Sequence, residues 1–278
     1  MRWTVLSDNR SDGGALETEH GLSILLETSG HKLLLDTGRS DMFMRNAEAL
    51  GIRLDDVDYV FISHGHYDHA GGLKAFMEFN KKAKVIVSPH AVNGNYFSLR
   101  GHLHSLAAEW PSVSEERLIA VEHTRDIDGW IHVIADIDHS HTMPDANRHL
   151  FVQGISGGMV PDDFCHEIAL YADGLLFTGC AHNGLENILD ACPWPVQSVV
   201  GGFHLIDRHE TTEELKSLAK RLKRDYPTTG FYTSHCTGDS AFETMREVMG
   251  EQIKRFYCGL IESRESSVES RESRRRSY

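Results

Sequence analysis

The sequence has little of what secreted, membrane-embedded or nucleic-acid-binding proteins need. Its 278 residues include only five cysteines, an odd and scattered number that favours a reducing compartment over a disulfide framework. No apolar run approaches the roughly 20 residues that span a bilayer. The segment 1–7 turns polar too early for a secretion signal and is predicted to be the first strand. We therefore expect a cytoplasmic globular protein without a membrane partner.

Basic residues are scarce as well. The 28 lysines and arginines face 41 aspartates and glutamates, which gives a formal net charge of −13. Such a protein repels polyanions, and its basic residues are dispersed apart from 216–224 and the C-terminal end. We expect a small-molecule substrate, and nucleic acid is disfavoured as a partner. The oligomeric state stays open.

One segment is unusually rich in metal-binding groups. It places three imidazoles and one carboxylate within six positions, as His64, His66, Asp68 and His69. The segment follows a predicted buried strand over 57–62, and open α/β sheets place their ligands at such strand ends. Imidazole and carboxylate suit Zn²⁺, with Mn²⁺ and Fe²⁺ as alternatives. Because four groups are too crowded for one ion, we predict two ions, one on the first two histidines and one on the last two groups. A solvated histidine-rich loop is the alternative.

Strand and helix signals alternate along the chain, which predicts parallel strands with helices on the sheet faces. The predicted strands cover 22–28, 31–36, 84–88, 118–122, 131–137, 168–172, 175–178, 198–200 and 231–234, and the predicted helices cover 40–50, 73–79, 185–191 and 212–226. Residues 139–159 are predicted to be a long loop.

The chain is expected to form one domain over residues 1–261. Within it, segment 90–163 would shape the substrate pocket, as long functional loops often do. Its histidines are interpreted as solvated or locally hydrogen-bonded; they are His102, His104, His139, His141 and His149. The polar segment 262–278 lacks an apolar face, so we expect a disordered tail, with a frayed helix as the alternative.

Three further histidines each follow a predicted strand. They are His182, His204 and His235. Because the ends of parallel strands meet at one edge of a sheet, they are expected to converge on the histidine cluster. A hydrogen-bonded structural histidine is the alternative for each alone. Asp36 ends another strand and is predicted to orient a ligating imidazole, or instead to cap the helix that begins near residue 40.

These motifs together resemble one family. The cluster at 64–69 is accompanied by the motifs Glu19–Ser23, Leu35–Gly38, Thr178–His182, Gly201–Leu205 and His235–Gly238. This combination resembles the metallo-β-lactamase superfamily, and within it the branch of metal-dependent hydrolases that includes a dihydropterin ribofuranosylaminobenzene phosphate synthase. The resemblance covers about residues 1–260. It implies a four-layer αββα sandwich and a dinuclear centre that attacks its substrate with a metal-bound hydroxide.

The resemblance also assigns ligands and exposes two departures. His235 matches the last metal ligand of the superfamily. Cys180 stands where most members carry a bridging aspartate, so it is an additional candidate ligand, with a small buried thiol as the alternative. The usual third histidine has no counterpart, because two glycines lie at its place. His182 is our candidate to replace it, and His166 is the reserve.

The function implied is that of a metal-dependent hydrolase acting on a small phosphate-, ester- or lactone-type substrate. Asp68 would orient or accept a proton, and His204 would protonate the leaving group. His66 stands where flavodiiron relatives carry glutamate, which favours hydrolytic over redox chemistry. Two alternatives remain: a pterin-type synthase that couples a dihydropterin pyrophosphate to an aminobenzene ribofuranosyl phosphate, and a metal-binding or ligand-sensing protein with little turnover. His20 is expected at the rim of the site, and Cys236 is expected to pack behind it.

Overall fold

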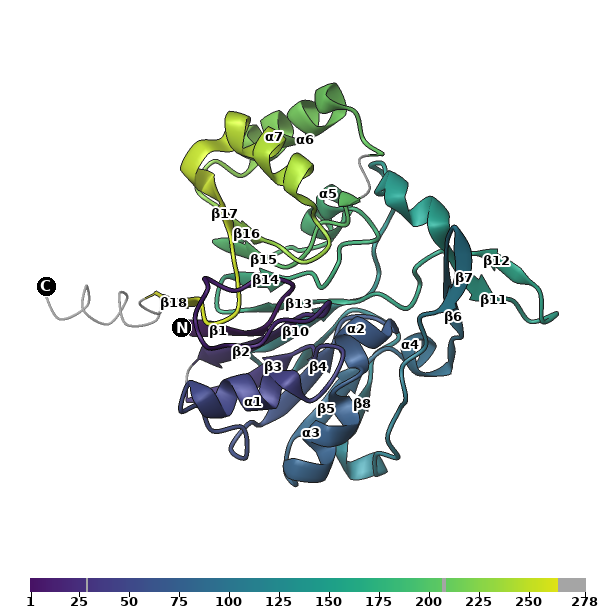
Figure 1. Cartoon of the computed structure of the whole chain (residues 1–278), viewed down its shortest axis with the longest axis vertical. Coiled ribbons are helices and arrows are strands. Elements are labelled where there is room, and N and C mark those ends of the chain that lie inside the picture. The colour runs from purple at the N-terminus through teal and green to yellow at the C-terminus, as the bar shows by residue number, and fades with distance from the viewer. Residues whose placement is uncertain (29, 207–208, 265–278) are drawn as a thin grey trace, which may run out of the picture.

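Two seven-stranded sheets pack face to face, and helices cover the outer face of each (Figure 1). The computed structural model describes residues 1–28, 30–206 and 209–264. In sheet order, the first sheet contains β18 (Ile261–Ser263), β1 (Arg2–Ser7), β2 (Ser23–Thr28), β3 (His31–Leu35), β4 (Tyr59–Ile62), β5 (Lys84–Val87) and β8 (Leu118–Ala120). The second contains β17 (Ile253–Arg255), β16 (Gly230–Thr233), β15 (Ser198–Val200), β14 (Leu175–Phe177), β13 (Ala169–Ala172), β10 (Ile131–Ile134) and β9 (Arg125–Ile127). The predicted four-layer sandwich is confirmed.

The layers follow from strands that are buried on both faces. Strand β4 is apolar throughout and fully buried, as expected for a parallel strand between two layers. Between the sheets, the rings of Phe61 and Phe177 meet edge to face with centroids 6.1 Å apart. The helices are α1 (Met42–Ala49), α2 (Tyr67–Ala70), α3 (Leu73–Phe79), α4 (Pro89–Asn93), α5 (Leu185–Asp190), α6 (Thr212–Asp225) and α7 (Asp239–Met249). Helices α1 and α3 pack on the first sheet, whereas α5, α6 and α7 pack on the second.

Helix α6 illustrates how local sequence sets these boundaries. Its N-terminus is a capping box, in which Thr211 accepts from the Glu214 backbone while the Glu214 side chain accepts from the Thr211 backbone. Its buried residues are Leu215, Ala219 and Leu222, spaced four and three apart on one face. The helix predicted over 212–226 is therefore observed with a difference of one residue. Helix α7 was not predicted.

Parallel pairing brings the candidate residues to one edge of the sandwich. Strands β3, β4 and β5 run parallel in the first sheet, and β14, β15, β16 and β17 run parallel in the second. The segment at 64–69 leaves the end of β4. The turns after β14, β15 and β16 carry Cys180, His204 and His235. Side chains from both sheets therefore meet across the sandwich.

A third sheet projects from the sandwich and corrects the prediction of a long loop over 139–159. It has the order β12 (Met159–Pro161), β11 (Leu150–Gln153), β6 (Tyr96–Arg100) and β7 (His102–Ser105), and we call these four strands the arm (Figure 1). A short 3-10 helix, Asp145–His149, precedes β11, and two others cover Glu115–Arg117 and Gly250–Gln252. The arm was not predicted because its strands pair with one another outside the main sheets. Few of its residues are buried there, so its sequence need not alternate between apolar and polar residues.

The C-terminal boundary also needs correction. Glu262 and Ser263 were predicted to begin a disordered tail, but they belong to β18, which pairs antiparallel with β1. The Arg264 backbone closes this edge by accepting from the N-terminal amine and donating to the Met1 carbonyl. The remainder of the predicted tail, 265–278, lies outside the described residues. Within the described part, no helix is both long and apolar enough to cross a membrane.

Candidate metal centre

The first half of the site is held in place by Asp36. This residue follows β3 with a left-handed backbone (φ 57°), and it is fully buried. Its carboxylate accepts from the Ser63 backbone and hydroxyl, each at 2.7 Å, and from Nδ1 of His69 at 2.6 Å. Because the Ser63 hydroxyl donates to Asp36, it accepts from Nδ1 of His64, 2.8 Å away. Asp36 thus contacts one cluster histidine directly and a second through a serine, whereas Asp41 occupies the N-cap position of α1.

Three buried histidines point bare nitrogens at one another. The Nε2 atoms of His64, His66 and His182 lack a hydrogen-bond partner among the described residues, and one ring nitrogen of each histidine lies within 4.8 Å of one from each of the other two. His64 donates through Nδ1, which leaves Nε2 as a lone pair. The same holds for His182, whose Nδ1 donates at 3.0 Å to the Asn147 side chain, while that amide donates to the His182 carbonyl. Such donor bonds are the usual way to aim an imidazole at a metal ion.

Burial keeps these imidazoles neutral, as metal ligands must be. It lowers the pKa of His64 and His182 well below the ordinary value, with neighbouring histidines adding to the effect. For His66, burial and the neighbouring His166 lower the pKa to about 3. Gly65 makes room within the cluster, because a Cβ at this position would lie 2.3 Å from the Tyr96 ring.

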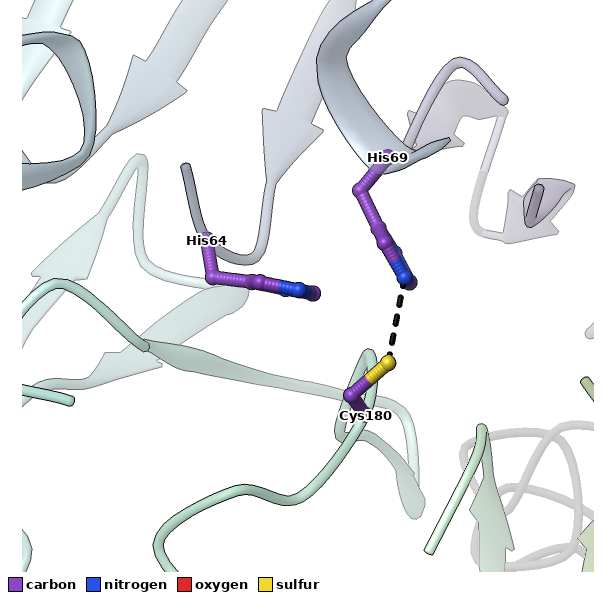
Figure 2. Close-up of side chains that lie close together, drawn as sticks. All are labelled: His64, His69 and Cys180. Atoms are coloured by element: carbon purple, nitrogen blue, oxygen red, sulfur yellow. Dashed lines mark hydrogen bonds between the residues drawn. The ribbon is translucent and has the colours of Figure 1, made fainter. Parts of the chain in front are cut away.

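The second group contains Asp68, His69, His235 and Cys180. Nε2 of His69 lies 3.1 Å from Nε2 of His235. Figure 2 shows its other contact, with Sγ of Cys180, also at 3.1 Å. The Asp68 carboxylate is 3.4 Å from Nε2 of His235. Burial alone would lower the pKa of His69, but the charges of Asp36 and Asp68 outweigh it and raise the pKa to about 9. A metal ion would have to displace that proton.

An asparagine fixes His235 in the same way as Asn147 fixes His182. Nδ1 of His235 lies 3.0 Å from the Asn9 side-chain oxygen, and the Asn9 amide donates to the His235 carbonyl at 3.3 Å. The same amide lies 3.1 Å from Nδ1 of His20, whose Nε2 is 3.1 Å from Asp68. His20 stacks on His235 with ring centroids 5.0 Å apart. His20 therefore reaches the exposed rim of the second group, as expected.

The turns that carry these ligands have an unusual backbone. Besides Asp36, positive φ angles occur at Ala181 (55°), His204 (46°) and His235 (47°), where a side chain is normally disfavoured. Strained conformations of this kind persist where the surrounding structure enforces them, and they gather at functional sites. The turns are packed tightly, since a Cβ at Gly202 would lie 2.4 Å from Sγ of Cys236.

His204 and His166 differ sharply in their surroundings. His204 is buried, both of its ring nitrogens lack a partner in the described part of the chain, and its ring lies 4.2 Å from that of His182. His166, the reserve ligand, has Nδ1 accepting from the Gly65 backbone and Nε2 paired with Asp162, each at 3.1 Å. Its nitrogens are thus occupied, and the position beside His64 and His66 is taken by His182.

Several contributors were not recognised from the sequence. Glu167 is fully buried and accepts from the backbones of His182 and Asn183 at 2.8 and 2.7 Å, and burial raises its pKa to about 7. Cys236 places Sγ 3.2 Å from Sγ of Cys180. Asn9 and Asn147 belong to no recognisable sequence motif, so their contacts with His235 and His182 could not be predicted. The arm and loop histidines join none of the groups around the centre that we have described; His139, for example, pairs with Asn183 at 2.6 Å.

The arrangement fits divalent metal ions. Buried nitrogen, sulfur and carboxylate ligands converge in adjoining groups of three, each with all ligand atoms within 4.8 Å. Bare, tautomer-fixed imidazoles are costly to bury unless something binds them. Zn²⁺ accepts this mixture of donors.

Comparisons with known proteins agree with this chemistry. The 7,8-dihydropterin-6-methyl-4-(beta-D-ribofuranosyl)-aminobenzene-5'-phosphate synthase of Methanocaldococcus jannaschii is 26% identical over 284 residues, which cover 93% of this chain and 95% of that protein. Protein MJ0448 of the same organism is also 26% identical, over 87% of this chain and 91% of its own. The crystal structure of Tm1679, described as a metal-dependent hydrolase of the beta-lactamase superfamily, has a TM-score of 0.80 and 29% identity, covering 96% of this chain and 100% of Tm1679.

The family itself is identified by a match to most of the domain. Residues 17–235 match the sequence model of the metallo-beta-lactamase superfamily, and this span contains all three predicted strand-end histidines as well as the cluster at 64–69. The chain belongs to the metallo-β-lactamase superfamily.

Proposed function

We propose that this protein is a metal-dependent hydrolase with a dinuclear centre, acting on a small phosphate-, ester- or lactone-type substrate. One observation carries the proposal: three buried histidines, whose Nε2 atoms have no partner among the described residues, gather beside a second group that contains Asp68, His69 and His235. His64, His66 and His182 would hold one ion. The second group would hold the other, and Cys180 is an additional candidate ligand.

The ions would supply the electrophilic chemistry. Two bound divalent ions lower the pKa of a water molecule towards about 7 and polarise a carbonyl or phosphoryl oxygen. Zn²⁺ is our first candidate, with Mn²⁺ and Fe²⁺ as alternatives.

The protein's own groups would handle protons. Asp68 offers Oδ2 as an acceptor at the half-open side of the site, where His20 hydrogen-bonds to it at 3.1 Å. His204 would donate a proton to the leaving group, because its ring nitrogens are free of other described partners. Its turn is held rigid by the hydrogen bond from the Phe203 backbone to the Thr237 hydroxyl, 3.0 Å long.

A synthase is the second candidate, and the relative from Methanocaldococcus jannaschii favours it because the similarity extends over nearly both full lengths. In that case the same centre would activate a nucleophile on a pterin-type substrate and expel a phosphate group. Water would have to be kept away from the reacting bond.

A product assay distinguishes the two. Purified protein, its metal content measured by mass spectrometry, would be incubated with phosphodiesters, thioesters and lactones, and separately with dihydropterin pyrophosphate plus an aminobenzene ribofuranosyl phosphate. We expect hydrolysis that stops with a chelator and returns with Zn²⁺. Coupling without simple hydrolysis would establish the synthase instead. Two bound metal equivalents with neither product would indicate a metal-binding or ligand-sensing protein.

A further inference from the structure

We propose that Cys236 is a further ligand of the second ion, the one also assigned to Asp68, His69 and His235. Cys180, Cys236 and His235 then make that position rich in thiolate, in contrast to the all-imidazole position of His64, His66 and His182. The inference rests on the proposed function only in requiring that the centre binds metal. It makes the two ions chemically unequal.

The geometry places the two sulfurs at the same point. Sγ of Cys236 lies 3.2 Å from Sγ of Cys180, and both lie within 4.8 Å of a ring nitrogen of His235. All three residues are nearly inaccessible to solvent, with 3%, 3% and 2% of their surface exposed. They come from the turns after two parallel strands, β14 and β16, that flank β15 in the second sheet. Two thiolates combined with an imidazole are a known ligand set for Zn²⁺.

The glycine that follows β15 leaves space for the Cys236 sulfur. Gly202 follows β15, between the two cysteine turns, and any Cβ there would lie 2.4 Å from Sγ of Cys236. The same absent side chain would meet the Cys180 backbone only at 3.6 Å. The glycine therefore makes room for the Cys236 sulfur in particular.

Other buried cysteines in the protein lie in different surroundings. Cys258 accepts from the Asp8 backbone at 3.1 Å, and Cys192 lies 3.7 Å from the Trp194 carbonyl, so each has a backbone partner of its own. Cys236 instead has the Cys180 sulfur as its nearest hydrogen-bond partner, with the Cys180 carbonyl more distant at 3.9 Å. Two thiols that face each other beside imidazoles form a donor set for a soft or borderline cation such as Zn²⁺, Co²⁺ or Cd²⁺.

X-ray absorption on the full-length protein loaded with Zn²⁺ tests the proposal directly. Zinc–sulfur bonds are near 2.3 Å and stand apart from zinc–nitrogen bonds near 2.0–2.1 Å. We compare the natural protein with Cys180→Ser, Cys236→Ser and the double variant, using Cys192→Ser as the matched buried-thiol control. We expect Cys236→Ser to reduce the sulfur signal by about one bond per protein, Cys180→Ser to retain part of it, and the double variant to lose it. The control should match the natural protein.

Two results would overturn the proposal: an unchanged sulfur signal in Cys236→Ser, or complete loss in Cys180→Ser alone. Co²⁺-loaded samples give a second readout, because thiolate-to-cobalt charge transfer in the near ultraviolet should weaken in both single variants. If the variants fail to fold, cadmium NMR on the natural protein reports the number of sulfurs on each ion, and no two-sulfur resonance would refute the proposal. Failure of the proposed function alone looks different, since there the natural protein would bind metal with the expected sulfur signal and show no turnover.

Discussion

Replacing Asp36 by asparagine should weaken metal binding without removing any proposed ligand. The carboxylate accepts from Ser63 and from Nδ1 of His69 at 2.6 Å. An asparagine keeps one acceptor oxygen, but its NH₂ group would face an N–H or O–H group of His69 or Ser63. Two donors would then meet where a hydrogen bond exists now. Loss of such an orienting partner typically costs 10–100-fold in affinity, or about 1.4–2.8 kcal/mol. Competition titrations against a chromogenic chelator measure this change.

The same substitution should alter the stability of the metal-free protein. The pKa of His69 is raised from 6.5 to about 9, so the folded state holds a proton that the unfolded state releases between these pH values. Stability is therefore fully present below pH 6.5 and falls as pH rises through about 9, by at most roughly 3 kcal/mol. Asp36→Asn should make stability depend less on pH, because one of the two charges that raise the pKa of His69 is lost. The Asp68 charge would preserve part of the dependence.

Urea unfolding in excess chelator, repeated across this pH range, measures how the free energy of unfolding of the metal-free protein depends on pH. Asp58→Asn is the matched control, because Asp58 also accepts from a backbone amide and pairs with a cation, Lys82 at 2.9 Å, but lies away from the cluster. Metal affinity unchanged within a factor of three, together with an unaltered pH profile, would refute the reasoning.

Three other predictions follow from individual contacts. His64→Ala should remove one metal equivalent and abolish turnover, whereas the exposed His90→Ala should do neither; unchanged metal content by mass spectrometry would contradict the site as a whole. Gly65→Ala should lower the free energy of unfolding by about 1–3 kcal/mol, because its Cβ would overlap a tyrosine ring, while Gly158→Ala, with open space around it, should change it by less than about 0.5 kcal/mol in denaturant titrations. Glu167→Gln should cost about 1–3 kcal/mol and weaken metal binding in chelator competition, since it presents a donor to backbone donors; a fully stable variant with normal affinity would argue against a positioning role.

Most strands and helices of the sandwich were predictable from sequence patterns, because burial sustains those patterns, whereas the layering came from the resemblance to the superfamily. The strand predicted over 198–200 has the same bounds in the structure. Its three residues are all buried, and turns that are clear in the sequence lie on both sides of it. The arm could not be foreseen, because β6 and β11 pair with each other across about 50 intervening residues and no pattern encodes that partner.

The candidate site was predictable only where ligands sit close in sequence or at strand ends. The choice between His182 and His166 depended on which ring nitrogens are left unpaired, and that follows from Asp162 and Asn147, which carry no signal of their own. Cys236 packs against the site as predicted, but its contact with the Cys180 sulfur could not be foreseen, because the distance between two sulfurs on separate turns is a property of the folded sheet. Asn9 and Glu167 support ligands from positions remote in the chain.

The division of the ligands between the two sheets has a consequence for how the protein folds. The proposed all-imidazole position combines His64 and His66, which follow a strand of the first sheet, with His182, which follows a strand of the second, so it is complete only once the two halves have docked. Metal binding there would add its free energy to the docked state alone and would link the two halves of the chain. An isolated half would then bind the ion weakly, and a chelator would loosen the contact between the sheets.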